Sequence, residues 1–273
     1  MFYFDGNILK SSLLDKAGIV HGFGTRNGGV STEPHTKSFN VGENLGDSHE
    51  TVMKNKDIFA SLVSGGVMTG KNTVTAHQIH SAYIREIGYD NLGEGYDRNQ
   101  GEDCDGYITS VPGVMPIVKT ADCTPILLCG TREDGSHAVS AVHAGWRGTV
   151  KGIAAEAVRL LREKGCVDVA AAIGPHIGFC CYEVGDDFID AVKDVRGNRF
   201  AEEYVRMYDD GRYHADLTGM NYEILIEAGV RSDRIDISSY CTACETDMFF
   251  SHRAMNGKRG TMGSGIAILP DNI

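Results

Sequence analysis

Four short apolar segments follow one another in the middle of the chain and are separated only by turn-length gaps. They cover residues 106–110, 114–119, 125–129 and 137–143. Segments of this length that are bounded by Gly, Pro, Asp or Ser are typical of β-strands. We therefore expect these residues to form part of a β-sheet.

Further strands and a long loop are expected on both sides of this region. Residues 73–87 are rich in β-branched side chains and predict two strands or one bent strand, whereas residues 90–103 are Gly-rich, acidic and loop-like. Additional strands are expected at residues 19–25, 167–173, 235–238, 248–251 and 265–269.

Three helices are expected between the strands. Thr149 is predicted to cap a helix whose apolar residues repeat at helical spacing. Asp216 is predicted to cap a second helix. A capping box formed by Asp47 and Glu50 predicts a third helix, with residues 53–62 as its body.

The overall pattern is strand-heavy, with a few helices between the strands and no Pro- or Ser-rich linker. Apolar residues make up 42% of the 273 positions and charged residues 23%, which is typical of a globular protein. Single domains of about 250 residues are routine. The sequence therefore predicts one α+β domain over residues 1–273, in which helices cover the sheets.

The net charge limits the kinds of partner that the chain can bind. Lys and Arg number 26 and Asp and Glu number 37, so the formal charge at pH 7 is −11. An acidic chain repels phosphate backbones over long range, so general binding to nucleic acid is excluded. Any anionic ligand would have to be held by a local cationic pocket.

The N-terminus, residues 1–7, lacks a basic region, a long apolar run and a small-residue cleavage site. Apolar runs elsewhere fall short of the roughly 20 residues that cross a bilayer. We therefore expect a cytoplasmic protein that binds no membrane. Its eight cysteines are too sparse for a disulfide scaffold, so they should be reduced and available for packing, metal binding or catalysis.

Three segments concentrate His, Cys and Asp at predicted strand ends or turns, where folds present functional groups. They are residues 76–81, 120–125 and 141–149. In an extended strand, His77 and His80 would point to opposite faces. At most one of these two histidines is therefore expected to join a common site.

His80, Cys123 and His143 together form a mixed nitrogen and sulfur donor set. Three protein ligands that leave one position open are how catalytic zinc is held. The same trio would also suit a Cys–His pair for nucleophilic catalysis, with the third residue as a helper. The residues alone leave both interpretations open.

Arg147 lies beside the expected N-terminus of the helix that follows His143. Helix N-terminal amides attract anions, and the guanidinium fork suits phosphate or carboxylate. An anion site near Arg147 and a simple surface ion pair are both compatible with this position.

Two pairs of cysteines lie outside these segments. Cys241 and Cys244 have C-x-x-C spacing, but a structural zinc site would need a second pair at matching spacing, and none is evident nearby in the sequence. Cys180 and Cys181 are adjacent and are expected to alternate in direction, so they should not serve one site. A redox disulfide between Cys241 and Cys244 stays open.

Several motifs occur in one order along nearly the whole chain. They are His21-Gly22-Phe23, Asn40-Val41-Gly42, Gln78-Ile79-His80, Asp105-Gly106-Tyr107, Ala121-Asp122-Cys123-Thr124-Pro125, His143-Ala144-Gly145-Trp146-Arg147-Gly148, Cys241-Thr242 and Phe249-Phe250-Ser251-His252-Arg253. This order closely resembles the YfiH/laccase-domain family, also described as purine nucleoside phosphorylases related to human laccase domain-containing protein.

The resemblance implies a single domain layered α/β/β/α and a zinc ion held by His80, Cys123 and His143. The implied activities are phosphorolysis of adenosine, inosine, guanosine and methylthioadenosine to the base and (methylthio)ribose 1-phosphate, with deamination of adenosine. Asp122 would act beside the three ligands, either by orienting one of them or by moving a proton.

Four further residues are expected to bind substrate. Arg147 and Arg26 would place inorganic phosphate, and Asn40 and Arg253 would line the pocket. Ser81 departs from the glycine that is frequent at this position in the family, which bears on substrate preference. The implied partners are small purine nucleosides and phosphate, bound by a monomer or a weak homo-oligomer.

Two other functions compete with this interpretation. A cysteine amidase or peptidase that edits cell-wall precursors would use Cys123 and His143. A copper-dependent polyphenol oxidase is the second, since imidazole and thiolate also bind copper. A laccase, however, needs many more His ligands than His80 and His143 for its several copper ions.

Overall fold

Two six-stranded sheets pack face to face, and helices cover the outer side of each sheet. The computed structural model describes residues 1–270. The arrangement confirms the predicted α+β fold of a single domain with α/β/β/α layers. The end of the predicted domain, residues 271–273, lies outside the described residues.

The first sheet combines strands from both ends of the chain. In spatial order they are β1 (Phe2–Asp5), β2 (Ile8–Ser11), β3 (Val20–Gly24), β14 (Met262–Ala267), β7 (Met115–Thr120) and β4 (Thr73–Val74). Its outer face is covered by α2 (His49–Ser64), whose Phe59 and Val63 are buried with Met115 and Ile117. A short helix, α1 (Ser12–Lys16), connects β2 to β3.

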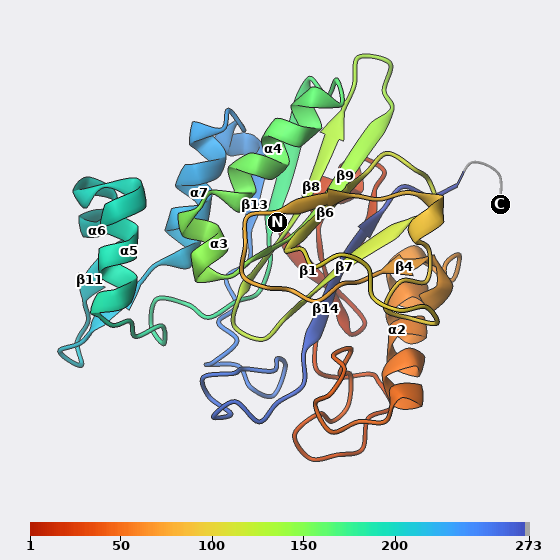
Figure 1. Cartoon of the computed structure of the whole chain (residues 1–273), viewed down its shortest axis with the longest axis horizontal. Coiled ribbons are helices and arrows are strands. Elements are labelled where there is room, and N and C mark those ends of the chain that lie inside the picture. Colours follow the sequence, from red (N-terminus) through yellow and green to blue (C-terminus); the bar gives the residue numbers. More distant parts are fainter. Residues whose placement is uncertain (271–273) are drawn as a thin grey trace.

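The second sheet contains three of the four strands expected in the middle of the chain, whereas the strand expected at residues 114–119 is β7 of the first sheet. In spatial order its strands are β13 (Ile235–Ile237), β10 (Asp168–Ile173), β8 (Thr124–Thr131), β9 (His137–Ala144), β6 (Gly106–Thr109) and β5 (Ile84–Glu86). Its outer face is covered by α3 (Trp146–Val150), α4 (Ile153–Glu163) and α7 (Leu217–Glu227). In Figure 1, α2 lies on one side of the strands, and α4 and α7 lie on the other.

A smaller extension projects from one end of the molecule (Figure 1). It consists of α5 (Asp186–Arg196), α6 (Asn198–Tyr204) and a two-stranded sheet formed by β11 (Val205–Met207) and β12 (Tyr213–Ala215). Three 3-10 turns occupy Gly70–Asn72, Tyr89–Asn91 and Ser232–Arg234. Among the helices of residues 1–270, none combines the length and apolarity that a membrane span requires.

The middle core lies between the two sheets. Phe23 and Val118 of the first sheet pack with Leu127, Val139 and Ala141 of the second, and each of these side chains is at most 1% exposed. Because strand side chains alternate, the opposite faces of both sheets are free to contact helices. Two further apolar clusters fill those outer layers.

Two predicted helix starts are wrong. The cap of α2 is Ser48, whose hydroxyl accepts a hydrogen bond from the Thr51 amide at 3.2 Å, whereas Asp47 accepts bonds from three loop side chains. Thr149 lies inside α3 instead of capping a long helix. The helix is divided because Gly152, at φ 81°, adopts the left-handed conformation that ends α3 and precedes α4.

Whether an expected strand forms depends on pairing with distant segments, which the local sequence does not reveal. The strand expected at residues 248–251 is absent there: Phe249 and Phe250 are fully buried, but their backbone lies among turns. Residues 73–87 form two short strands, β4 and β5, which was one of the two alternatives. Strands β1 and β2, helix α1 and the whole extension from α5 to β12 were not predicted from the sequence.

The contact between the sheets predicts a stability effect. Leu127→Ala should lower the free energy of unfolding by about 2–5 kcal/mol, because it leaves a cavity between two rigid layers. Val167→Ala is the matched control: its side chain is 54% exposed just before β10, so the change should stay within about 0.5 kcal/mol. Urea unfolding measures both variants, and equal midpoints would contradict the packing described here.

Candidate active site

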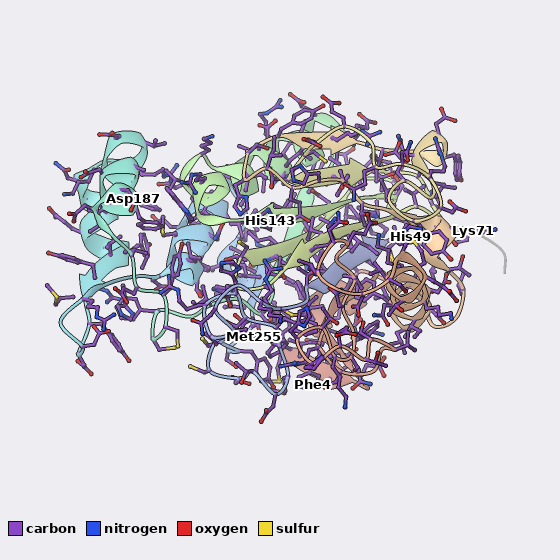
Figure 2. The ribbon with its side chains drawn as sticks, turned by 60° about the horizontal axis from the view of Figure 1, so that its bottom comes forward. Phe4, His49, Lys71, His143, Asp187 and Met255 are labelled. Atoms are coloured by element: carbon purple, nitrogen blue, oxygen red, sulfur yellow. The ribbon has the colours of Figure 1, made fainter. Side chains whose placement is uncertain are left out.

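Strand register brings segments that are distant in sequence to one end of the second sheet. Thr124 pairs with Ala144, Gly106 with Val142, and Ile84 with Gly106. The residues just beyond these strand ends therefore meet: Cys123 before β8, His143 near the end of β9, Asp105 before β6 and the segment 79–81 before β5. Figure 2 shows His143 near the centre of the molecule, well away from Asp187 of the extension and His49 of α2.

The three residues expected to bind a metal lie together at this end. Cys123 Sγ is 3.9 Å from His80 Nε2, and the two imidazole rings meet edge to face with centroids 4.9 Å apart. The donor atoms of His80, Cys123 and His143 all lie within 4.8 Å of one another. His77 is exposed, with its ring 3.3 Å from Asp103, so only one histidine of that segment joins the cluster, as predicted.

A fully buried carboxylate, Asp105, supports both histidines. It accepts a hydrogen bond from His143 Nδ1 at 2.8 Å and bonds from the backbone amides of Ile79, His80 and Ser81 at 3.3, 3.0 and 2.6 Å. The Ser81 hydroxyl donates a further bond at 2.7 Å. The three amides converge because His80 adopts a left-handed conformation, φ 59°, which turns successive N–H groups toward one anion.

Charge and burial shift the pKa values of this group strongly. Burial raises the pKa of the Cys123 thiol, but His143 and His80 beside it lower that pKa to about 6. Burial lowers the pKa of His143, but Cys123 and Asp105 raise it to about 9. The pKa of Asp105, although raised by burial, is held at about 2 by hydrogen bonds from His143 and Ser81. The protein therefore favours a thiolate and a carboxylate on either side of one imidazolium.

The chemistry of this donor set fits a metal ion such as zinc. Cysteine binds zinc as the thiolate and histidine through a ring nitrogen, and such histidines usually donate their other ring N–H to a carboxylate. His143 donates from Nδ1 to Asp105 in this way and leaves Nε2 for a metal. The cluster has three donors among the described residues, so a fourth position remains for water or substrate.

Two cavities meet at the donor cluster. One, of about 340 Å³, is lined by His80, Cys123, Lys119, Arg259 and Thr261, among others. The other, of about 350 Å³, shares three of these residues and adds Tyr182 and Arg253. A ligand that occupies both cavities would therefore pass directly over the candidate metal position.

Arg259 lines both cavities and was not predicted from the sequence. Its Nε is buried without a hydrogen-bond partner, and so is the Thr261 hydroxyl in the same cavity. Burial lowers the pKa of Arg259, and the charges of Cys123 and Asp122 raise it in part. A buried polar atom without a partner is costly, so both atoms are ready to bind a polar ligand.

Asp122, expected to act in catalysis, supports the loop that carries Cys123. One carboxylate oxygen accepts a bond from the Thr242 hydroxyl and the other from the Arg253 amide, both at 2.6 Å. Arg253 stays beside the donor cluster, and its guanidinium donates to the Glu183 carbonyl oxygen at 2.9 Å. Neither bond of the Asp122 carboxylate reaches His80, Cys123 or His143. The carboxylate that orients a ring of the cluster is Asp105, so both roles expected for Asp122 stay predictions.

The other predicted substrate residues lie outside the two cavities. Arg26 donates to the backbone oxygens of Lys37 and Thr246, and Arg147 is exposed with its guanidinium 4.1 Å from the Trp146 ring centre. Asn40 is fully buried and accepts bonds from the amides of residues 42 and 261, both at 2.9 Å. Asn40 thus shapes a cavity wall, whereas neither arginine lines the wall of either cavity.

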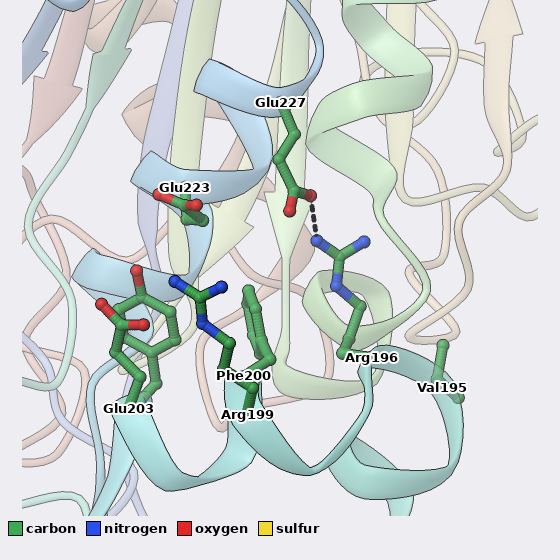
Figure 3. Close-up of a pocket in the computed structure, with 8 residues that line it drawn as sticks. Val195, Arg196, Arg199, Phe200, Glu203, Glu223 and Glu227 are labelled. Carbon is green, nitrogen blue, oxygen red and sulfur yellow. Dashed lines mark hydrogen bonds and ion pairs between the residues drawn. The ribbon is translucent and has the colours of Figure 1, made fainter.

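Figure 3 shows a different hollow, between α7 and the helices of the extension. Its volume is about 390 Å³, and its walls are mainly charged side chains. Arg196 is already paired with Glu227 in this hollow. Cys and His are absent from its lining, so it offers none of the chemistry of the donor cluster.

Two residues of the site were missed from the sequence, and one expectation about cysteines outside the site is wrong. Asp105 stands in a recognised motif, but its role depends on three segments that meet only in the fold. Arg259 has no local signal in the sequence, because only the fold brings it into the cavities that contain Cys123. The expectation that Cys180 and Cys181 could not serve one site is wrong, because they lie together with Cys241 and Cys244.

The fold and the site define a class: an α/β/β/α domain with a Cys-His-His donor cluster at the end of its second sheet. A family described as multi-copper polyphenol oxidoreductase laccase matches residues 20–269. The chain belongs to this family, which confirms the resemblance to the YfiH/laccase-domain proteins.

Individual relatives agree with this assignment. The purine nucleoside phosphorylase YlmD of Bacillus subtilis is 32% identical, covering 92% of this chain and 88% of the relative. Adenosine deaminase RL5, from an unknown prokaryotic organism, is 33% identical, covering 90% of this chain and 93% of the relative. The crystal structure of the Bacillus licheniformis hypothetical protein YfiH superposes with a TM-score of 0.87 at 32% identity, over 98% of both chains.

The role of Asp105 gives a direct prediction. Asp105→Asn should raise the zinc concentration that protects Cys123 from alkylation by about 10- to 100-fold, because the amide cannot accept all of the bonds that hold both histidines. Asp103→Asn changes an exposed carboxylate of the same loop and should leave protection unchanged. Peptide mass spectrometry of Cys123 measures the effect, and equal protection in both variants would contradict it.

Proposed function

We propose that this protein is a zinc-dependent purine nucleoside enzyme. It would catalyse phosphorolysis of adenosine, inosine, guanosine and methylthioadenosine, and also deaminate adenosine. The printed names of its relatives support nucleoside chemistry: several are purine nucleoside phosphorylases and one is an adenosine deaminase. The observation that carries the proposal is the convergence of His80, Cys123 and His143 where two cavities meet.

In this proposal the three donors hold zinc, and Asp105 orients the His143 imidazole and holds the backbone at His80. A bound zinc ion supplies Lewis-acid activation of water, which hydrolytic deamination requires. The thiolate of Cys123 would lower the net charge of the centre. The proposal includes a cytoplasmic location, in which a cysteine ligand stays reduced.

Inorganic phosphate would bind at Arg259 and Thr261. Both offer buried polar atoms without partners, and Lys119 lines the same cavity. In phosphorolysis, a phosphate oxygen bonds to C1′ of the ribose while the C1′–N9 bond breaks and the purine takes up a proton. A fixed phosphate next to C1′ would stabilise the positive charge that develops on the sugar in the transition state.

The nucleoside would lie across the second cavity. The ring of Tyr182 and the aliphatic part of Arg253 offer a surface for a flat base, and the Arg253 guanidinium lies 5.6 Å from the Tyr182 ring centre. Asp122 would keep this wall in place by binding the Arg253 amide. Arg26 and Arg147 would then have no direct part in binding phosphate.

One observation favours a second candidate function. The Asp105 carboxylate orients His143, and His143 lies beside the Cys123 thiol as a base would. This is the arrangement of a cysteine hydrolase. In an amidase or peptidase, Cys123 would attack a carbonyl carbon directly. A metal-free protein whose Cys123 is alkylated at once would favour this function over the zinc enzyme.

The central test is incubation of the zinc-loaded protein with adenosine and phosphate, followed by chromatography. Adenine, ribose 1-phosphate and hypoxanthine should appear, and His80→Ala should lower their rates at least about 100-fold, because a ligand is lost. His49→Ala, an exposed residue in the first turn of α2, is the control and should keep the rates. Full activity in His80→Ala, or none in the unmodified protein, would remove the proposal.

The phosphate site is tested separately. Arg259→Gln should raise KM for phosphate about 10- to 100-fold, because a charge-assisted hydrogen bond is lost in a buried site. Lys258→Gln removes an exposed charge one residue away and should leave KM unchanged. Initial rates at varied phosphate concentration measure both variants. A KM for phosphate that stays constant in Arg259→Gln would place the phosphate elsewhere.

A further inference from the structure

Four cysteines from two loops meet outside the proposed active site. One pair, Cys180 and Cys181, follows β10, and the other, Cys241 and Cys244, follows β13. Since β10 and β13 are adjacent and parallel, their loops leave the sheet at the same end. A bridge between His176 and Cys241 continues this pairing beyond the strands, and the Thr242 amide donates to the His176 carbonyl oxygen at 3.0 Å.

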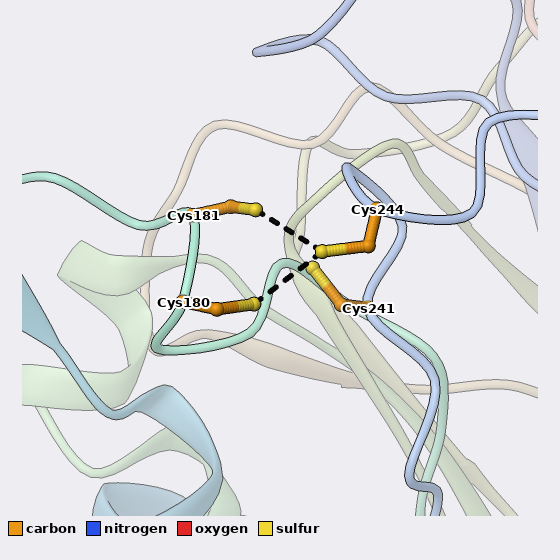
Figure 4. Close-up of side chains that lie close together, drawn as sticks. All are labelled: Cys180, Cys181, Cys241 and Cys244. Atoms are coloured by element: carbon orange, nitrogen blue, oxygen red, sulfur yellow. Dashed lines mark hydrogen bonds between the residues drawn. The ribbon is translucent and has the colours of Figure 1, made fainter.

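Both pairs lie in turns, which brings all four sulfurs to one point. The amide of Cys181 donates to the Gly178 carbonyl oxygen at 3.0 Å, so adjacent side chains do not alternate as they would in a strand. The amide of Glu245 closes a similar turn on the Cys241 carbonyl oxygen at 3.0 Å. Figure 4 shows the two pairs pointing toward each other from separate loops.

The spacing of the sulfurs matches a tetrahedral metal site. Cys244 Sγ lies 3.5 Å from Cys180 Sγ and 3.3 Å from Cys181 Sγ, and all four sulfurs lie within 4.8 Å of one another. Four thiolates bound to one zinc ion at about 2.3 Å are roughly 3.8 Å apart. Small adjustments of the side chains would therefore complete such a site.

The surrounding backbone also suits thiolate ligands. The Gly178 amide donates to Cys241 Sγ at 3.2 Å, a bond that stabilises negative charge on sulfur. A Cβ at position 178 would lie 3.4 Å from the sulfurs of both Cys180 and Cys241, so glycine lets the backbone approach the cluster closely. Amides of this kind commonly orient and tune metal-bound cysteines.

We propose that Cys180, Cys181, Cys241 and Cys244 bind a second zinc ion, in a structural site separate from the His80–Cys123–His143 centre. Four cysteine ligands close the coordination shell, so this site holds no position for a substrate. The proposal does not depend on the nucleoside chemistry, because it concerns only the four thiols and the two loops that they join.

The second zinc would fix the wall of the active site. Tyr182, directly after Cys181, lines the cavity that contains Cys123, and Thr242, directly after Cys241, donates to Asp122 at 2.6 Å. Arg253 also donates to the Cys181 carbonyl oxygen at 3.4 Å. Binding of the metal would join the loop after β10 to the loop after β13 where both support catalytic groups.

The first measurement is the metal content of the purified full chain, grown with zinc. Elemental analysis should find two zinc ions per chain. His80→Ala, which loses the first centre, should keep one zinc, and Cys180→Ser with Cys244→Ser in that background should keep none. Cys166→Ala removes a buried thiol that lies outside the cluster, so in the His80→Ala background it should still keep one zinc.

Cobalt gives a second readout that does not require activity. His80→Ala loaded with cobalt should show the intense visible bands of tetrahedral cobalt and strong thiolate-to-metal charge transfer. Both signals should disappear when Cys180 and Cys244 are changed to serine. Loss of the second zinc should also lower Tm.

Other outcomes would overturn the proposal. A folded His80→Ala chain without metal, confirmed by circular dichroism, would exclude the second site. Disulfides at these cysteines in the freshly isolated protein would assign the cluster to redox chemistry, and iron instead of zinc would exclude the stated metal. The nucleoside assay of the unmodified protein tests the proposed function by itself, so failure of this proposal and failure of the proposed function remain distinguishable.

Discussion

One buried carboxylate holds the active site together. Asp105 is fully buried, and burial of an ion is costly unless its oxygens are satisfied. Three consecutive amides, the Ser81 hydroxyl and the His143 ring supply the hydrogen bonds that compensate this cost. The same bonds set the backbone conformation at His80 and the orientation of His143. Two of the three donors therefore depend on a single residue that would never touch the metal.

Much of this arrangement is visible in the sequence, because strands and chemically distinctive residues leave local signals. The central strands and the donor trio were predicted from residue types, alternation predicted that at most one of His77 and His80 joins the site, and the family resemblance indicated His80. Asp105 and Arg259 were not predicted, because their roles come from contacts between segments far apart in the chain. The paired cysteines were misjudged for a related reason: alternation was assumed at Cys180 and Cys181, whereas a turn places both sulfurs on one side.

The net charge of the whole chain differs in sign from the charge of the cations at the candidate phosphate site. The chain carries a formal charge of −11, yet its candidate phosphate site contains Arg259 and Lys119. Burial lowers the pKa of Lys119 to about 8, so its charge is held less firmly than that of an exposed lysine. Long-range repulsion disfavours polyanions, while a small anion gains from two nearby cations and buried unpaired donors. The proposed binding of inorganic phosphate would depend on this contrast.

Strands and loops contribute different parts of the site, and this difference has a consequence for evolution. His143 and the residues next to Cys123 and Asp105 are fixed by the register of the second sheet, in which a slip of one residue would reverse every side chain. Much of the cavity walls, by contrast, comes from loops, including residues 42–45 and 252–261. Descendants of one ancestral chain can therefore exchange loop residues and acquire different substrates while they inherit an unchanged reaction centre.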